Sequence, residues 1–203
     1  MFIPPLFAED DPEVVAAIID QARLGLLVTH GPEGLQATHL PFLHDGGRGR
    51  LVGHIARANR QWQVSQGPAL VVFAGPEAYV SPNWYPSKAV DGKQVPTWNY
   101  EAVHVTGAVE WFHDEARLKD VVSRLSDRFE EGRPRPWTLD EAPADYIDRL
   151  LRGIVGVEIA IERIEAKRKL SQNKPDADRA GVVAGLTASD DPRDHALARR
   201  MRP

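Results

Sequence analysis

Hydrophobic and polar positions alternate along much of the chain with the two-residue period of β-strands. Short apolar and β-branched runs between glycine-rich turns predict strands at 26–30, 35–43, 51–56, 69–74, 77–81 and 154–164. A longer alternation over 95–112 puts Val103 and Val105 on one face and His104 and Thr106 on the other. That pattern is typical of a strand lying over a hydrophobic core.

Three longer segments have apolar residues three and four positions apart, which predicts helices at 11–24, 114–131 and 139–152. Asp114 can cap the second helix, and Thr138 to Glu141 has the pattern of a capping box. A shorter helix is expected at 58–66. Because short strands fill the early chain and helices gather late, the sequence predicts an α+β fold, a β-barrel with flanking helices.

Composition narrows the class of protein. The chain has 203 residues and no cysteine, which excludes disulfides, iron–sulfur clusters, cysteine-ligated zinc and thiol nucleophiles. Its 29 acidic and 25 basic residues give a net charge of -4, which argues against a nucleic-acid-coating protein. The longest apolar runs are far shorter than a membrane span, and the first residues lack the pattern of a signal peptide. We expect a soluble cytoplasmic protein with no membrane contact.

Standard catalytic motifs are missing: there is no Walker loop, no GxSxG elbow and no HExxH pair. Ser171 to Lys174 matches an SxxK pattern, but the companion motifs of that enzyme class are absent. His39, His54 and His104 are too far apart in sequence to indicate a metal site, and hydrogen bonding at a pocket rim is the favoured interpretation. The sequence therefore predicts neither a catalytic residue nor a metal.

Polar residues gather in two stretches where strands are usually apolar, Thr38–Phe42 and Gly53–Asn59. Pro41 cannot donate a ladder hydrogen bond, so its strand has an edge or a bulge there, with backbone groups free for a flat heterocycle. Arg57 and Asn59 follow a strand and precede a short helix, a placement that suits a phosphate. A solvated arginine at a strand end is the alternative.

Aromatic residues mixed with polar ones form a second concentration over Tyr79–Lys88 and Val95–Tyr100. Rings with polar tips are common at interfaces and in ligand pockets. An aromatic corner of the core is the alternative interpretation.

These stretches carry a family resemblance. The words THLPF, GHIARAN, AYVSPNWYPSK and VPTWNY, together with Lys169–Asn173, resemble the PaiB family of FMN-binding negative transcriptional regulators. The likeness runs from Met1 to about Leu186, so we expect one FMN-binding domain over 1–186 and a C-terminal arm of undetermined role at 187–203. The resemblance implies an FMN-binding split β-barrel related to flavin reductases and pyridoxamine-phosphate oxidases. It also implies a homodimer that holds FMN at or near the subunit interface.

The resemblance also implies cofactor-binding residues. One group would line the isoalloxazine ring, largely through backbone atoms: Thr38, His39, Leu40 and Pro41. A second would reach the ring edge, the ribityl chain and the phosphate: His54, Ile55, Arg57, Ala58 and Asn59. A third would close the pocket, with the other subunit as one source: Lys88, Trp98, Asn99, Lys169, Ser171 and Gln172. One departure from the family is Arg60, where we expect proline.

The function that follows is an FMN-binding homodimeric flavoprotein of the repressor type, without catalytic activity. The alternative is an FMN-dependent oxidoreductase or flavin reductase on the same fold, because FMN carries redox chemistry itself. A heme-handling split barrel is a third interpretation, which no sequence feature marks. The only basic cluster, Arg193, Arg199, Arg200 and Arg202, lies in the expected arm. We therefore expect DNA contact to be weak or indirect.

Overall fold

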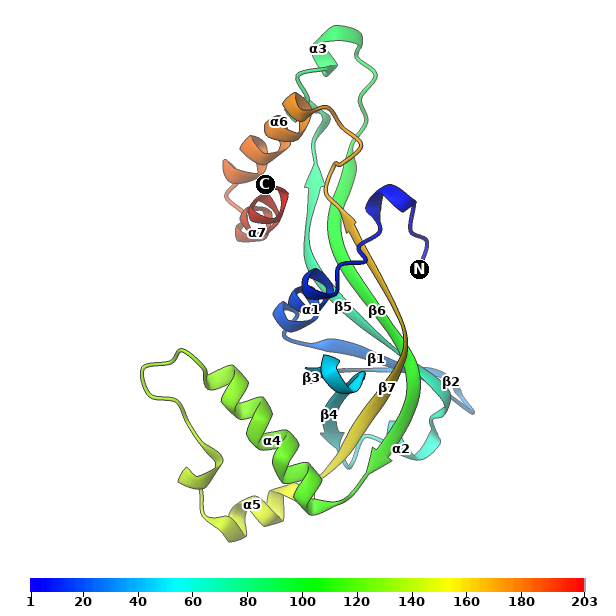
Figure 1. Cartoon of the computed structure of the whole chain (residues 1–203), viewed down its shortest axis with the longest axis vertical. Helices are drawn as coiled ribbons and strands as arrows, with labels where there is room; N and C mark the ends of the chain where they lie inside the picture. Colours follow the sequence, from blue (N-terminus) through cyan, green and yellow to red (C-terminus); the bar gives the residue numbers. More distant parts are fainter. Residues whose placement is uncertain (203) are drawn as a thin grey trace. The chain divides into compact units, whose positions relative to one another are not determined.

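The computed structural model describes residues 1–202, and its strands form one seven-stranded sheet (Figure 1). The strand order is β2-β1-β5-β6-β7-β4-β3, and the neighbours β2–β1, β1–β5, β4–β7 and β3–β4 pair antiparallel. The strands are β1 (Gly25–Gly31), β2 (Gly34–Leu40), β3 (Phe42–Asp45), β4 (Arg50–Ala56), β5 (Gln66–Val80), β6 (Thr97–Phe112) and β7 (Ile154–Lys169).

Helices connect and flank these strands. The α-helices are α1 (Pro12–Gln21), α2 (Gln61–Val64), α3 (Lys88–Asp91), α4 (Glu115–Glu130), α5 (Ala144–Leu151), α6 (Asp176–Thr187) and α7 (Pro192–Met201). Short 3-10 turns are η1 (Pro5–Phe7), η2 (Gly46–Arg48), η3 (Pro82–Trp84) and η4 (Leu139–Glu141). Among residues 1–202, no helix has the length and apolar character that a membrane crossing requires.

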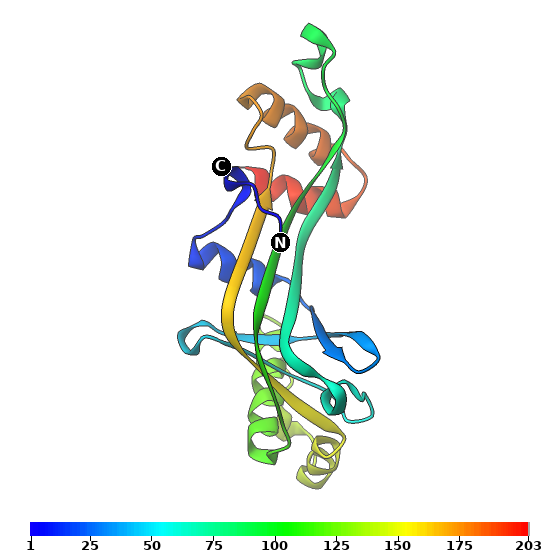
Figure 2. The ribbon, with the colours of Figure 1, turned by 90° about the vertical axis from the view of Figure 1, so that its right-hand side faces the viewer.

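The chain divides into two compact units, and the division falls within the three long strands β5, β6 and β7 (Figure 2). Unit 1 contains Met1–Ile18, Ala74–Val103 and Glu165–Pro203, and unit 2 contains Ile19–Phe73 and His104–Ile164.

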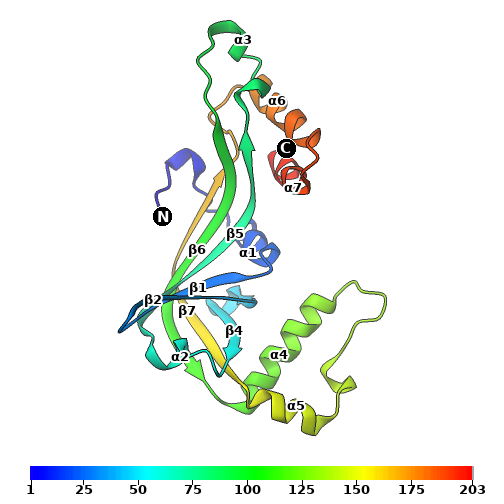
Figure 3. The same cartoon turned by 180° about the vertical axis from the view of Figure 1, so that it is seen from behind.

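Unit 2 contains the hairpin β1–β2, the strands β3 and β4, and the helix pair α4–α5 (Figure 3). Asp114 caps α4 as predicted, since its side chain accepts a hydrogen bond from the backbone N–H of Arg117. The amphipathic helices α4 and α5 bury one core with β3 and β4, formed by Leu43, Val52, Phe112, Leu118, Val121, Leu125, Leu139, Ile147 and Leu151.

Unit 1 has a separate core, in which α6 and α7 pack together. Its buried members are Ala78, Val80, Tyr85, Leu170, Val182, Leu186, Leu197, Ala198 and Met201. Gly181 and Gly185 let α6 approach Trp84, because a Cβ at Gly181 would lie 2.0 Å from the Trp84 carbonyl oxygen.

Several element boundaries differ from the sequence expectation. Residues 69–74 and 77–81 belong to one strand, β5, which continues through Pro76 beyond Val72, the last residue that pairs with β1. The expected strand 154–164 continues to Lys169. The expected helix 139–152 is instead the short turn η4, followed by α5 from Ala144 after Pro143.

The segment 187–203, expected as a C-terminal arm of undetermined role, contains the helix α7. Within its described part, α7 buries Leu197, Ala198 and Met201 in the core of unit 1. The Arg200 guanidinium lies 3.2 Å from a carboxylate oxygen of Glu101, a side chain that is only 1 % exposed. Apolar burial and this ion pair together fasten the segment to its unit.

Candidate functional site

The two polar stretches expected to form one site meet in unit 2. β2 ends at Leu40 and β3 begins at Phe42, so Pro41 is the point where the chain leaves one edge strand of the sheet and enters the other. The β4 residue Gly53 lies against this junction, because a Cβ there would be 2.7 Å from the Pro41 carbonyl oxygen. Glycine at position 53 therefore allows β4 to approach the Leu40–Pro41 corner.

A hydrogen-bond network joins the two stretches. The Asn59 side-chain amide donates to the Thr38 hydroxyl at 2.8 Å, and that hydroxyl donates to Gln61 Oε1 at 2.6 Å. Asn59 Oδ1 in turn accepts from the Gln61 backbone N–H at 3.0 Å. Asn59 therefore fixes the turn that leads from β4 into α2 and connects it to β2.

Gln61 is the buried centre of this network, and the sequence reasoning did not identify it. The residue is 1 % exposed, and its amide donates to the Thr29 hydroxyl at 3.0 Å. A glutamine at the start of a short helix is ordinarily solvated, so its type gives no signal of this role. The informative feature is its place two residues after Asn59, in the segment already expected to bind a ligand.

His54 and Ile55 lie on β4 at the same corner. Ile55 is buried in the core, and His54 is partly buried with its Nδ1 atom enclosed and without a hydrogen-bond partner among the described residues. Burial lowers the pKa of the His54 imidazole, because desolvation penalises the charged form.

Arg57, Ala58 and His39 are exposed. The Arg57 guanidinium donates from Nε to the carbonyl of Arg152 at 2.6 Å and from Nη2 to that of Ile154 at 3.3 Å. Arg57 thus holds the turn that joins α5 to β7, a role that its position at a strand end did not indicate.

The third predicted group lies in unit 1, where Trp98 and Lys169 occur together on β6 and β7. The Lys169 ammonium donates to the Trp98 carbonyl at 2.6 Å and to the Thr97 hydroxyl. Trp98 is 54 % exposed, and its ring meets that of Tyr79 edge to face with centroids 6.2 Å apart. Here, in unit 1, exposed aromatic side chains lie beside the Lys169 cation.

Asn99 and Ser171 are also together, but in the interior. The Asn99 amide donates to the Ser171 hydroxyl at 2.8 Å, while Asn99 Oδ1 is buried without a partner among the described residues. Ser171 has a φ of 62°, the left-handed region that is uncommon outside glycine. Gln172 holds this bend by accepting from the Leu170 N–H at 2.7 Å, and Lys88 is bonded to Asn83 instead of to this group.

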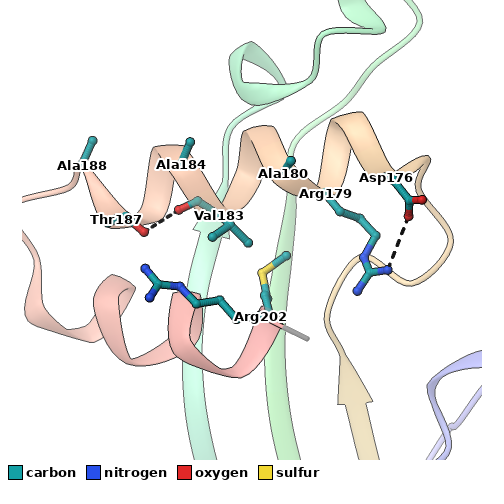
Figure 4. Close-up of a pocket in the computed structure, with 9 residues that line it drawn as sticks. Asp176, Arg179, Ala180, Val183, Ala184, Thr187, Ala188 and Arg202 are labelled. Carbon is teal, nitrogen blue, oxygen red and sulfur yellow. Dashed lines mark hydrogen bonds and ion pairs between the residues drawn. The ribbon is translucent and has the colours of Figure 1, made fainter.

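A groove between α6 and α7 in unit 1, with a volume of about 820 Å³, contains none of the predicted residues (Figure 4). Its lining is mostly small and apolar, with Ala180, Val183 and Ala184 from α6. Arg179 lies 3.8 Å from Asp176 at one end. The polar side chains of its lining are Asp176, Arg179, Thr187 and Arg202.

The corner in unit 2, in contrast, has the donor set that a flavin ring requires. As an edge strand, β2 has backbone N–H and C=O groups that no neighbouring strand uses, the hydrogen-bonding edge that isoalloxazine needs. On β4, His54 Nδ1 is enclosed and has no hydrogen-bond partner among the described residues. These residues fit the polar edge of a flavin.

The seven-stranded sheet has the split β-barrel fold of several solved structures. A flavocytochrome from Azotobacter vinelandii has the same fold, with a TM-score of 0.60 and 19 % identity, over 86 % of this chain and 75 % of that one. An FAD- and heme-binding protein from Mycobacterium smegmatis aligns with a TM-score of 0.58 and 18 % identity, over 85 % and 78 % of the two chains. The predicted fold class is thereby confirmed.

The sequence itself identifies the family. Residues 1–163 match the family described as "Putative FMN-binding domain". The chain is also 32 % identical over 205 residues to Protease synthase and sporulation protein PAI 2 of Bacillus subtilis (strain 168), covering 99 % of this chain and 96 % of that relative. The chain belongs to this FMN-binding family, which confirms both the PaiB resemblance and FMN as the expected cofactor.

Proposed function

We propose that this protein is a cytoplasmic, homodimeric FMN-binding regulator of the PaiB type, acting as a negative regulator of transcription. The observation that carries the proposal is the Thr38–Asn59–Gln61 network, which fixes a polar corner beside a free sheet edge. The PAI 2 relative supports the regulatory part of the proposal, since its name refers to protease synthesis and sporulation.

The residues of unit 2 would hold the flavin ring. Backbone groups of Thr38, His39, Leu40 and Pro41 would bind its polar edge, and the segment from His54 to Asn59 would follow the ring edge and the ribityl chain. When bound, FMN supplies redox chemistry of its own, whereas the chain binds, orients and shields it.

The predicted residues of unit 1 form a group of their own, which would close the pocket from the other subunit of the proposed homodimer. Trp98 and Lys169 present a ring and a cation that can touch a cofactor, and Lys88 is exposed. Asn99 and Ser171 are buried, so they would not touch the cofactor themselves but would fix the backbone around Trp98 and Lys169. Gln172 would maintain the bend at Ser171.

The test of cofactor binding is a titration of the purified chain with FMN, followed by flavin fluorescence. We expect Thr38→Val to weaken FMN binding by about tenfold, since the hydroxyl orients the corner through two hydrogen bonds worth about 1 kcal/mol each. Thr187→Val is the matched control, because its hydroxyl donates within α6 to the Val183 carbonyl. Equal affinities for the two variants would contradict the proposed site. Bleaching of bound FMN by NAD(P)H would instead favour the oxidoreductase alternative.

The homodimer is proposed from exposed aromatic surface. Tyr79 and Trp98 are 46 % and 54 % exposed and lie edge to face, and aromatic side chains of this kind are enriched at protein interfaces. A stable homodimer interface commonly buries about 2,000 Å² or more. Light scattering at micromolar concentration should give twice the chain mass of 22.5 kDa, and a monomer mass would refute the proposal.

A further inference from the structure

The groove between α6 and α7 lies wholly within unit 1 and contains none of the residues of the proposed flavin site. Its volume of about 820 Å³ is in the range of about 300–1,000 Å³ that small-molecule sites usually have. Ala180, Val183 and Ala184 line it from α6, and Met201 lines it from α7. Because Ala180 and Ala184 are exposed, the groove is open to solvent and can admit an apolar molecule.

The polar part of the lining carries a net positive charge. The Thr187 hydroxyl is already used, since it donates to the Val183 carbonyl within α6 at 2.7 Å. The fully exposed Asp176 carboxylate lies 3.8 Å from the Arg179 guanidinium, an ion pair that water screens. Two guanidinium groups, of Arg179 and Arg202, therefore stand against one carboxylate, which leaves an excess of one positive charge.

Both guanidinium groups have donors that the chain does not use. Arg179 Nε is enclosed and has no hydrogen-bond partner among the described residues. No hydrogen bond or ion pair joins the Arg202 side chain to another of residues 1–202, and Figure 4 shows this side chain along the α7 side of the groove. Since an enclosed N–H without a partner costs free energy, a ligand oxygen that accepts from it is favoured.

The chemistry of the lining selects the ligand. A guanidinium group binds a carboxylate through two parallel hydrogen bonds, and an apolar wall favours a hydrocarbon group. We propose that the groove binds a small amphipathic molecule with one carboxylate group, its apolar part against Ala184 and Val183 and its carboxylate on Arg202. Arg179 strengthens the binding through its charge. A single negative charge matches the excess charge of the lining, whereas a phosphate with close to two negative charges exceeds it. This second ligand site goes beyond the proposed flavin-binding function.

The test is calorimetric titration of the full chain with decanoate, which has one carboxylate and an apolar chain. Decylammonium has the same chain with the opposite charge, and propionate has the same carboxylate on a short chain. Decanoate should bind at least about tenfold more tightly than decylammonium, the difference expected for one charge-assisted contact, and more tightly than propionate. Equal affinities for decanoate and either of the other two compounds would overturn the proposal.

Two kinds of variant locate the site. Arg202→Gln should weaken decanoate roughly tenfold, and Arg179→Gln should weaken it by a smaller factor. Ala184→Leu should remove most of the binding, because the larger side chain fills the groove. The matched controls are Arg199→Gln on α7 and Ala177→Leu on α6, both at exposed positions outside the lining, and they should bind as the unmodified chain does.

Thermal melting of each variant shows that it is folded. Unchanged decanoate affinity in Arg202→Gln or in Ala184→Leu would overturn the proposal. Loss of a dimer mass in Ala184→Leu, measured by light scattering, would also overturn it, because the groove would then be a contact between two copies of the chain.

Discussion

Gln61 is the position where one substitution tests the architecture of the candidate site most directly. Replacing it by leucine keeps a side chain of similar volume without a branch at Cβ but removes both polar groups of the amide. The change deletes the bond to the Thr29 hydroxyl at 3.0 Å and the bond from the Thr38 hydroxyl at 2.6 Å. The backbone bond to Asn59 is retained, so the turn before α2 is not itself removed.

The expected loss follows from those two bonds and from burial. Each contributes about 1 kcal/mol net, and a hydroxyl left buried without a partner costs about 1 kcal/mol more. Thr29 is 3 % exposed and cannot turn to water. Gln61→Leu should therefore reduce the free energy of unfolding by roughly 2–4 kcal/mol, which for a chain of this size lowers the melting temperature by roughly 5–15 °C.

The assay is thermal and urea unfolding of Gln61→Leu beside Gln63→Leu, the same chemical change at an exposed position of the same helix. A double-mutant cycle with Thr38→Val should give a coupling energy of about 1 kcal/mol, because the two side chains share one hydrogen bond. The reasoning fails if Gln61→Leu is as stable as Gln63→Leu, or if the cycle shows no coupling.

Three further expectations concern pH and DNA. Burial lowers the pKa of His54, so below about pH 6.5 the unfolded chain binds a proton that the folded chain does not, and stability should fall as pH drops. Urea midpoints measured between about pH 5 and 8 should depend less on pH in His54→Gln than in the unmodified chain. The exposed control His39→Gln should keep the pH dependence of the unmodified chain. Hydrogen bonds from the Ser87 hydroxyl and N–H lower the pKa of Asp178. The stability that they contribute above the ordinary pKa of 3.8 is lost as pH falls through the lowered pKa. Ser87→Ala should move acid unfolding, followed by circular dichroism, to higher pH, and an unchanged midpoint would contradict this. Binding to duplex DNA should be weak and indifferent to sequence across a salt series, since Arg193 and Arg200 are ion-paired within the chain; a thousandfold preference for promoter over random duplex at physiological salt would refute it.

Local pattern alone determined much of the fold. Alternation of apolar residues located the strands around Val103 and Val105, and the caps Asp114 and Thr138 marked the starts of α4 and η4. Such features depend on neighbours a few residues away, so they can be read without tertiary information. The stretches THLPF, GHIARAN, AYVSPNWYPSK and VPTWNY, together with Lys169–Asn173, indicated the family and its cofactor, which the match to the FMN-binding family and the Bacillus subtilis relative confirm.

Only the tertiary structure decided how the polar residues are used. The sequence indicated Thr38 and Asn59 as binding residues. Their contact, and the bonds of the buried Gln61 amide to β1, join residues 21 to 34 positions apart in the chain. Likewise, the sequence places Arg200 in a basic cluster, whereas its ion pair with Glu101, about a hundred residues earlier in the chain, follows only from the fold. The type of a side chain limits what it can bind. Its burial and its partners determine what it does bind, and both are set by the fold.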